Sequence, residues 1–264
     1  MKRLCVFASG SGTDFQSVID GVNTGKIDGK IVLLVASRPD IYAVERAKKN
    51  GIEVAVFRKK DYESAEKMYD ALIPVLKEKG VELIILAGYL TVLTPNIVAA
   101  YRDKIINIHP SLIPKYCGDG YYGMRVHEAV IAAGEKESGA TVHFVDEGTD
   151  TGKIIEQRKV PVLSGDTPET LQKRVLEVEH ELLPDVVARG RQVMANMERV
   201  ASLFVTKTAY SALISLGVVL MGIPFPYLPR HISYIGALTI GAPAFFLALA
   251  PNTRRYIPGF LRRV

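Results

Sequence analysis

Two side chains with complementary chemistry stand two residues apart within residues 105–114, which read Ile-Ile-Asn-Ile-His-Pro-Ser-Leu-Ile-Pro. Asn107 carries an amide donor, and His109 carries an imidazole that titrates near neutral pH. A fixed donor can stabilise an oxyanion as it develops, and such an imidazole can help to move protons. The pair is therefore a candidate for catalytic chemistry. The alternative is a polar pair that ends a core strand.

The elements around this pair decide where the two side chains point. Residues 105–108, isoleucines with one Asn among them, predict a short buried strand. The strand has to stop at Pro110, which has no N–H to donate to a neighbouring strand. Side chains two residues apart on a strand share a face, so Asn107 and His109 are expected together. They would lie at the carboxyl end of a strand, where open α/β sheets form their sites.

The rest of the N-terminal part alternates between short apolar runs and amphipathic runs. This alternation predicts an α/β fold, in which a mostly parallel sheet has helices on both faces. The run 83–87 is strongly apolar, so it is expected to be central and buried. The predicted strands are 3–8, 31–36, 53–57, 83–87, 105–108, 140–145 and 153–160. The predicted helices are 14–22, 42–50, 64–79 and 126–133, with further helices starting at 94–95 and after 168.

A glycine-containing segment, Ser-Gly-Ser-Gly-Thr-Asp at residues 9–14, joins the first predicted strand to the first predicted helix. Glycines at such a junction let backbone amides turn toward an anion at the helix N-terminus. A dinucleotide site would need a third glycine near Phe15 and an acid where the next strand instead ends in Ser37-Arg38. The segment therefore favours a single phosphate over NAD. The alternative for Asp14 is an ordinary helix N-cap.

Residues 107–114 are close to the signature of the phosphoribosylglycinamide formyltransferases, and the resemblance runs from Met1 to about Val187. It implies the formyltransferase fold and a cytoplasmic enzyme of purine biosynthesis. The implied reaction transfers a formyl group from the co-substrate 10-formyltetrahydrofolate to the amine of glycinamide ribonucleotide, without a metal or a nucleic acid. Two relatives share the His-Pro-Ser-Leu core. Formyltetrahydrofolate deformylase, a hydrolase kept as an alternative, normally has a domain before this fold, and methionyl-tRNA formyltransferase normally has one after it.

The resemblance also assigns roles to residues. Asp150 matches the family's catalytic aspartate, and its charge near His109 is expected to raise the pKa of the imidazole. The implied ribonucleotide contacts are Gly12, Thr13, Asp14 and Glu179. The implied folate contacts are Leu90, Thr91, Val92, Leu93, Asp146, Glu147, Gly148, Thr149 and Asp150. The alternatives are a buried loop at 88–93, a solvated hairpin at 146–152 and a solvent-facing helix acid at Glu179. His143, in a predicted strand, is expected to be structural.

The charge distribution divides the chain. Through Glu198 there are 26 basic and 28 acidic residues, whereas residues 199–264 hold seven basic residues and no acidic one. Residues 208–229 and 231–253 carry no formal charge, and at about 1.5 Å per residue each could cross a hydrocarbon core of about 30 Å. Basic residues flank their outer ends, so the positive-inside rule puts both ends in the cytoplasm. Cys5 and Cys117 are the only cysteines, which excludes a disulfide framework.

Two domains are therefore predicted: a formyltransferase domain at 1–188, and at 189–264 a basic linker followed by a transmembrane helical hairpin. Parts of residues 183–208 and residues 243–249 resemble the late transmembrane region of P-type cation ATPases, although the Asp-Lys-Thr-Gly nucleophile motif is absent. The chain is interpreted as a fusion, anchored to the cytoplasmic membrane by residues 208–253. The rival interpretation is a membrane transport component whose soluble part is a degenerate folate-binding sensor.

Overall fold

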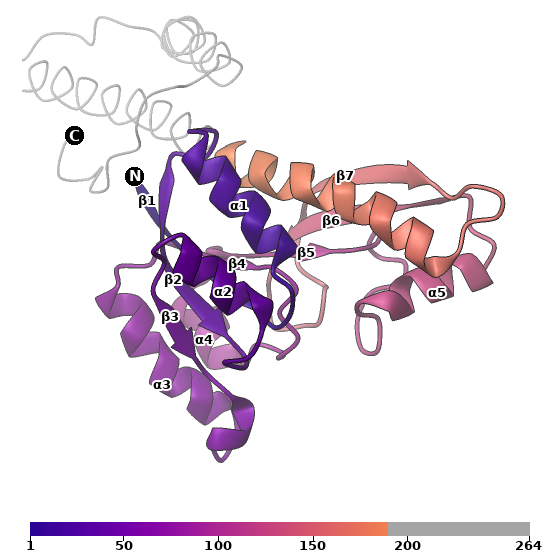
Figure 1. Ribbon diagram of the computed structural model, residues 1–264. Helices are drawn as coiled ribbons and strands as arrows, with labels where there is room; N and C mark the ends of the chain where they lie inside the picture. The colour runs from indigo at the N-terminus through magenta and orange to yellow at the C-terminus, as the bar shows by residue number, and fades with distance from the viewer. Residues whose placement is uncertain (190–264) are drawn as a thin grey trace, which may run out of the picture. The chain divides into compact units, whose positions relative to one another are not determined.

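The computed structural model describes residues 1–189, of which Met1–Ala188 form one compact unit (Figure 1). A seven-stranded sheet in the order β3-β2-β1-β4-β5-β6-β7 lies at its centre. β1 to β5 run parallel, and at one edge β6 pairs antiparallel with β5 and β7 pairs antiparallel with β6. The predicted α/β fold with a mostly parallel sheet is confirmed for this part of the chain. The strands are β1 (Lys2–Ala8), β2 (Gly29–Ala36), β3 (Val54–Val56), β4 (Leu83–Leu86), β5 (Ile105–His109), β6 (Glu137–Phe144) and β7 (Ile154–Pro161).

Helices cover both faces of the sheet. α1, α2 and the helix over residues 168–189 share one apolar cluster, whereas α3 and α4 share a second cluster on the other face. Figure 1 shows the orange helix 168–189 beside α1. The labelled helices are α1 (Thr13–Asn23), α2 (Tyr42–Lys49), α3 (Ala65–Glu78), α4 (Pro95–Ala100) and α5 (Met124–Ala132), with one 3₁₀ turn, η1 (Lys59–Asp61).

β1 shows how a central strand contributes to both clusters. Leu4, Val6 and Ala8 belong to the cluster under α1, and Cys5 and Phe7 belong to the cluster under α3. Each of these side chains is at most 1% exposed, so apolar burial on both faces holds β1 in the middle of the sheet. The predicted position of the apolar run beginning at residue 83 is likewise confirmed, because β4 is the fourth of the seven strands.

Local sequence also sets where α3 begins and which face it buries. The side chain of Ser64 accepts a hydrogen bond from the backbone N–H of Lys67 at 3.1 Å, a cap worth about 1 kcal/mol. Met68, Leu72 and Leu76 follow at intervals of one helical turn, and all three are fully buried. This packing fixes the layer behind β1 and β4, two of the three strands that precede loops of the site.

The parallel strands bring three loops to one edge of the sheet. β1, β4 and β5 are neighbours and run in the same direction, so the segments that leave their carboxyl ends meet there. These segments are residues 9–12, 87–94 and 110–123. The Asn107–His109 pair lies at the same edge, at the end of β5.

The predictions for the C-terminal part concern residues beyond the described range. The spans 208–229 and 231–253, nearly all of the domain 189–264, and most of the ATPase-like residues lie outside residues 1–189. Within residues 1–189, no helix combines the length and the apolar character needed to span a bilayer.

Candidate active site

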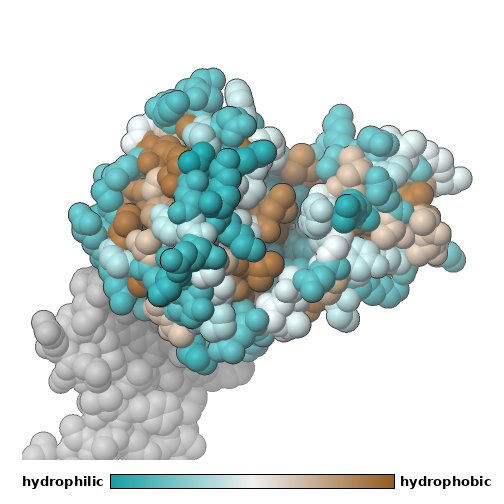
Figure 2. Space-filling model, turned by 90° about the horizontal axis from the view of Figure 1, so that it is seen from below, coloured by the Kyte–Doolittle hydropathy of each residue, from teal (hydrophilic) through white to brown (hydrophobic). Residues whose placement is uncertain are grey.

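A cavity of about 570 Å³ opens at the carboxyl ends of β4 and β5. Cavities that bind small molecules commonly have roughly 300–1,000 Å³, so this one can hold a substrate. Figure 2 looks onto a hollow with apolar surface along it. The lining comes from within residues 86–93, 107–110, 118–123, 143–150 and 172–179, together with Asp14 and His127.

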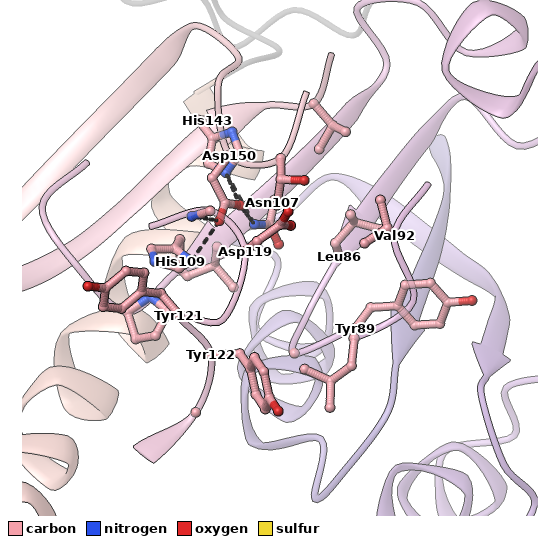
Figure 3. A pocket seen from close by; sticks show the side chains of 18 of the residues that line it. Leu86, Tyr89, Val92, Asn107, His109, Asp119, Tyr121, Tyr122, His143 and Asp150 are labelled. Atoms are coloured by element: carbon pink, nitrogen blue, oxygen red, sulfur yellow. Dashed lines mark hydrogen bonds and ion pairs between the residues drawn. The ribbon is translucent and has the colours of Figure 1, made fainter. Parts of the chain in front are cut away.

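Four polar side chains meet on one wall of this cavity (Figure 3). Nδ2 of Asn107 lies 3.1 Å from Nε2 of His143 and donates to Oδ1 of Asp150 at 3.3 Å. Nδ1 of His109 lies 3.5 Å from Oδ2 of Asp150, and the same oxygen accepts a hydrogen bond from the N–H of Gly118 at 3.0 Å. The structure thus brings together the three predicted catalytic residues, Asn107, His109 and Asp150.

Backbone carbonyls fix the proton positions on both histidine rings. Nε2 of His109 lies 2.9 Å from the carbonyl oxygen of Tyr116, and Nδ1 of His143 lies 2.8 Å from that of Phe144. A carbonyl oxygen only accepts hydrogen bonds, so these two ring nitrogens are the donors. In the neutral rings, Nε2 of His143 and Nδ1 of His109 therefore carry lone pairs. The first accepts from the Asn107 amide, and the second can take up a proton.

The pKa values of Asp150 and His109 result from opposing effects. Burial raises the pKa of Asp150, but His143, His109 and the N–H of Gly118 together bring it below its usual value. Burial lowers the pKa of His109, which is 5% exposed, and outweighs the upward effects of Asp150 and the Tyr116 carbonyl. The prediction that the pKa of His109 rises is therefore wrong, because desolvation of the imidazolium exceeds its attraction to the carboxylate.

The segment after β4 forms an apolar wall facing the polar cluster. The predicted folate contacts Leu90, Thr91, Val92 and Leu93 all line the cavity. Leu90 and Val92 are each 61% exposed, so the segment is not the buried loop of the alternative interpretation. The N–H of Leu90 donates to Oγ of Ser9 at 3.0 Å, which ties this wall to the end of β1.

The loop at 146–150 contributes to the cavity through most of its residues. Asp146, Gly148, Thr149 and Asp150 line it, whereas Glu147 is exposed and lies outside the lining. Oδ1 of Asp146 accepts hydrogen bonds from the N–H of Gly148 at 3.1 Å and from Oγ1 of Thr151 at 2.7 Å. These bonds fold the loop back on itself, and the structure separates Glu147 from the other predicted folate contacts.

The glycine segment leads into α1 through Gly12, which has a φ of 69° and is the N-cap. A Cβ at this position would lie 2.7 Å from Cβ of Ala43, so the close approach requires glycine. Asp14 lies in the first turn and does not cap the helix, so the N-cap alternative is wrong. Of the predicted ribonucleotide contacts on this segment, Asp14 lines the main cavity. Thr13 lines a second cavity of about 410 Å³, and Gly12 lines neither of the two.

Glu179, on helix 168–189, lines the same cavity as Asp14. It is 6% exposed, so the alternative of a solvent-facing acid is wrong. Burial raises the pKa of Asp14 to about 6. Burial, together with the charge of Asp14, raises the pKa of Glu179 well above its usual value. Two acids with elevated pKa values thus stand at the α1 side of the cavity.

Two histidines that the sequence analysis did not assign to the site line the cavity. His143 is 1% exposed and faces Asn107, its cross-strand partner on β5. Pairing of the two predicted strands 105–108 and 140–145 is the sequence signal that could have placed His143 in the site. His127, on α5, is 2% exposed, and burial followed by the proximity of His109 lowers its pKa to about 4. No sequence pattern distinguishes His127 from an ordinary helix residue.

Comparisons with known proteins match the part of the chain that carries this site. The family model described as formyl transferase matches residues 2–187. The phosphoribosylglycinamide formyltransferase of Haemophilus influenzae is 40% identical over 187 residues, which cover 71% of this chain and 86% of that protein. The chloroplastic enzyme of the same name from Arabidopsis thaliana is 44% identical over 187 residues, covering 70% of this chain. The crystal structure of glycinamide ribonucleotide transformylase 1 from Geobacillus kaustophilus superposes with a TM-score of 0.67, at 42% identity, covering 71% of this chain and 97% of that one.

The matched region and the cavity coincide, because every lining residue falls within residues 2–187. The chain spans 64% of the Arabidopsis protein and 60% of its counterpart from Vigna unguiculata, which is less than two thirds of either. Over residues 2–187, this chain belongs to the formyl transferase family.

Proposed function

We propose that this chain is a phosphoribosylglycinamide formyltransferase, which transfers a formyl group from 10-formyltetrahydrofolate to the amine of glycinamide ribonucleotide. The observation that carries the proposal is the meeting of Asn107, His109 and Asp150 on one wall of the cavity. The relatives from Haemophilus and Arabidopsis bear this enzyme's name and support the assignment of substrates.

Asn107 is the donor for the formyl oxygen. Attack by the amine places negative charge on that oxygen, and a fixed donor there is worth about 3 kcal/mol in the transition state. The Nδ2 hydrogens of Asn107 face His143 and Asp150. Binding of the substrate therefore has to exchange one of these contacts for the formyl oxygen, and the contact with Asp150, at 3.3 Å, is the longer one.

His109 moves the proton between the two substrates. Its Nδ1 carries the free lone pair, because Nε2 faces the Tyr116 carbonyl, so Nδ1 accepts a proton from the attacking amine. The imidazolium that forms lies 3.5 Å from Asp150, which stabilises it until the proton passes to the departing folate nitrogen. Asp150 adopts a φ of 57°, a conformation that costs an L residue roughly 1–2 kcal/mol and is held by its contacts with Asn107 and Gly118.

The two substrates occupy different parts of the cavity. The apolar wall of residues 90–93, with the loop residues Asp146, Gly148 and Thr149, holds the flat ring of the folate. The ribonucleotide lies toward α1, where Asp14 and Glu179 line the cavity and the first backbone amides of the helix can bind its phosphate.

The test is a formyl-transfer assay on the purified chain with H109A and N107A, using C117A as the matched control. Cys117 follows Tyr116 in the same loop but lies outside the cavity lining. Each site variant is expected to reduce kcat by roughly 100-fold or more, while C117A retains it. Release of formate without glycinamide ribonucleotide, at the rate of the full reaction, would instead favour the hydrolase. Near-normal transfer by H109A would remove His109 from the mechanism.

We also propose that residues 208–253 anchor the enzyme to the cytoplasmic membrane as a two-span hairpin, with both ends in the cytoplasm. The support is the sequence alone: two runs of 22 and 23 residues without formal charge, and basic residues at their outer ends. The ATPase-like residues suggest that this part came from a membrane protein. Fractionation of cells that express the chain tests the anchor, because transferase activity found wholly in the soluble fraction would contradict it.

A further inference from the structure

Two acids at the α1 side of the cavity have no hydrogen-bonding side chain to balance them. Oδ1 of Asp14 is buried and has no hydrogen-bond partner among the described residues. Glu179 is 6% exposed and lines the same cavity, and its carboxyl group forms no hydrogen bond or ion pair with another residue in the range 1–189. Buried carboxyl groups normally have hydrogen-bond partners, so two that lack them and face a cavity indicate a ligand or a proton held there.

The neighbouring charged groups do not neutralise this pair. His180, next to Glu179, places Nε2 3.7 Å from Oδ1 of Asp14, but burial and then Arg46 lower its pKa, and Asp20 and Glu177 offset this only in part. Arg46, on α2, donates from Nε to the carbonyl oxygen of Ser11 at 2.9 Å and from Nη1 to Gln16 at 3.0 Å. The imidazole is therefore mostly neutral at pH 7, and the guanidinium donates to the loop carbonyl and to Gln16 on α1 rather than to the acids.

Two carboxyl groups close together in a buried place do not both ionise readily. Ionising the second carboxyl costs energy through repulsion by the first, in addition to the cost of desolvation. The pair therefore keeps a proton bound at a pH where exposed acids are ionised. The pKa values of Asp14 and Glu179 are both raised, as this argument expects. As the pH rises above about 6, Asp14 increasingly releases its proton, and the pair gains negative charge where the ribonucleotide is expected.

We propose that Asp14 and Glu179 act as one proton-binding unit, which takes up a proton when the anionic ribonucleotide binds and so makes its affinity depend on pH. The inference rests on the proposed function, because it takes the phosphate to lie at the N-terminus of α1. An ionised Asp14 in the first turn competes with the phosphate for the same positive end of the helix. A protonated Asp14 removes that competition and can donate a hydrogen bond to the ligand.

The experiment is calorimetric titration of the full chain with glycinamide ribonucleotide alone, without a formyl donor, so that no reaction occurs. Titrations in buffers with different enthalpies of ionisation give the number of protons taken up per ligand bound. The variants are D14N and E179Q. D20N is the matched control, because Asp20 lies on the same helix but outside the main cavity. Any proton uptake by the ligand itself is the same for the wild type and the three variants. A difference in proton uptake between these proteins therefore reports on the acid pair.

At about pH 7.5 the wild type and D20N are expected to take up a substantial fraction of a proton, and D14N and E179Q clearly less. The wild-type Kd is expected to rise by up to roughly tenfold per pH unit between about pH 7 and 8.5, more steeply than that of D14N. Equal proton uptake by the wild type and D14N would overturn the inference. If neither site variant binds, the wild-type Kd decides, since a Kd independent of pH in this range overturns it as well. A wild type that does not bind the ribonucleotide contradicts the proposed function itself.

Discussion

Nδ1 of His109 faces Oδ2 of Asp150 at 3.5 Å, and yet the imidazole has a lowered pKa. The carboxylate is already engaged by the N–H of Gly118 and the amide of Asn107, and the ring is almost completely buried. His109 is therefore mostly neutral at pH 7, and the lone pair on its Nδ1 faces the Asp150 carboxylate at the cavity wall. Such a ring is prepared to accept a proton, and Asp150 stabilises the charged form only once that proton has arrived.

The first prediction concerns the pH dependence of turnover. Because the neutral form of His109 is the base and its pKa is below the usual value, kcat should rise with pH along an acid limb whose midpoint lies below about pH 6.5, the usual imidazole pKa. The measurement is kcat with both substrates saturating, from about pH 5 to 8. An acid limb centred above the usual imidazole pKa would contradict the assignment.

The second prediction is that D150N retains the fold and loses most of its activity. An asparagine would turn an NH₂ group toward the N–H of Gly118 or the amide of Asn107, where both neighbours are donors. We expect kcat to fall by roughly 100-fold or more. The acid limb of the remaining activity should move to lower pH, because the charge of Asp150 raises the pKa of His109. Circular dichroism provides the folding control, and an unchanged kcat would exclude a catalytic role for Asp150.

The third prediction compares two glycines of the same loop. G12A should destabilise the protein by roughly 1–2 kcal/mol from its φ of 69° alone, with a further cost because its Cβ would meet Ala43 at 2.7 Å. G10A should be tolerated, because no atom lies within 4 Å of a Cβ at that position. Thermal unfolding and the KM for glycinamide ribonucleotide are the readouts. Equal unfolding temperatures and equal KM values for G12A and G10A would show that the turn into α1 does not depend on Gly12.

The fourth prediction concerns stability. The pKa of Asp14 rises from 3.8 in the unfolded chain to about 6 in the folded one, so the folded state binds more protons between these values. Stability due to this group is complete below about pH 3.8 and is lost as the pH rises through about 6, a difference of about 3 kcal/mol. D14N should therefore raise Tm near pH 8 relative to the wild type, and much less near pH 4. D20N, on the same helix, should show no such pH-dependent gain.

Much of the fold could be predicted because its determinants are local. Isoleucines before Pro110 predict a strand that ends at His109, and alternation along that strand puts Asn107 and His109 on one face. The continuous apolar run at 83–87 predicts a strand buried on both faces, and β4 spans Leu83–Leu86. These inferences need only chain geometry and burial, which are encoded within a few residues.

What could not be predicted depends on contacts between distant segments. The pKa of His109 depends on how deeply the ring is buried, and the position of Asp150 in the sequence does not reveal that. His143 enters the site because β6 pairs antiparallel with β5, bringing it opposite Asn107. The burial of Glu179 depends on which face helix 168–189 turns toward α1. Glu147 is adjacent to cavity residues in sequence but is turned outward by the hydrogen bonds of Asp146.

The pairing of β5 with β6 has a consequence for how activity is acquired during folding. Asn107 and His143 belong to strands that meet only when the antiparallel edge has docked on the parallel core, in a register where a shift of one residue would turn either side chain to the other face. Helices and parallel strands can form without completing the catalytic wall. After dilution from denaturant, the rate at which catalytic activity returns therefore reports the docking of this edge. The rate at which the helical circular dichroism signal returns reports a separate event.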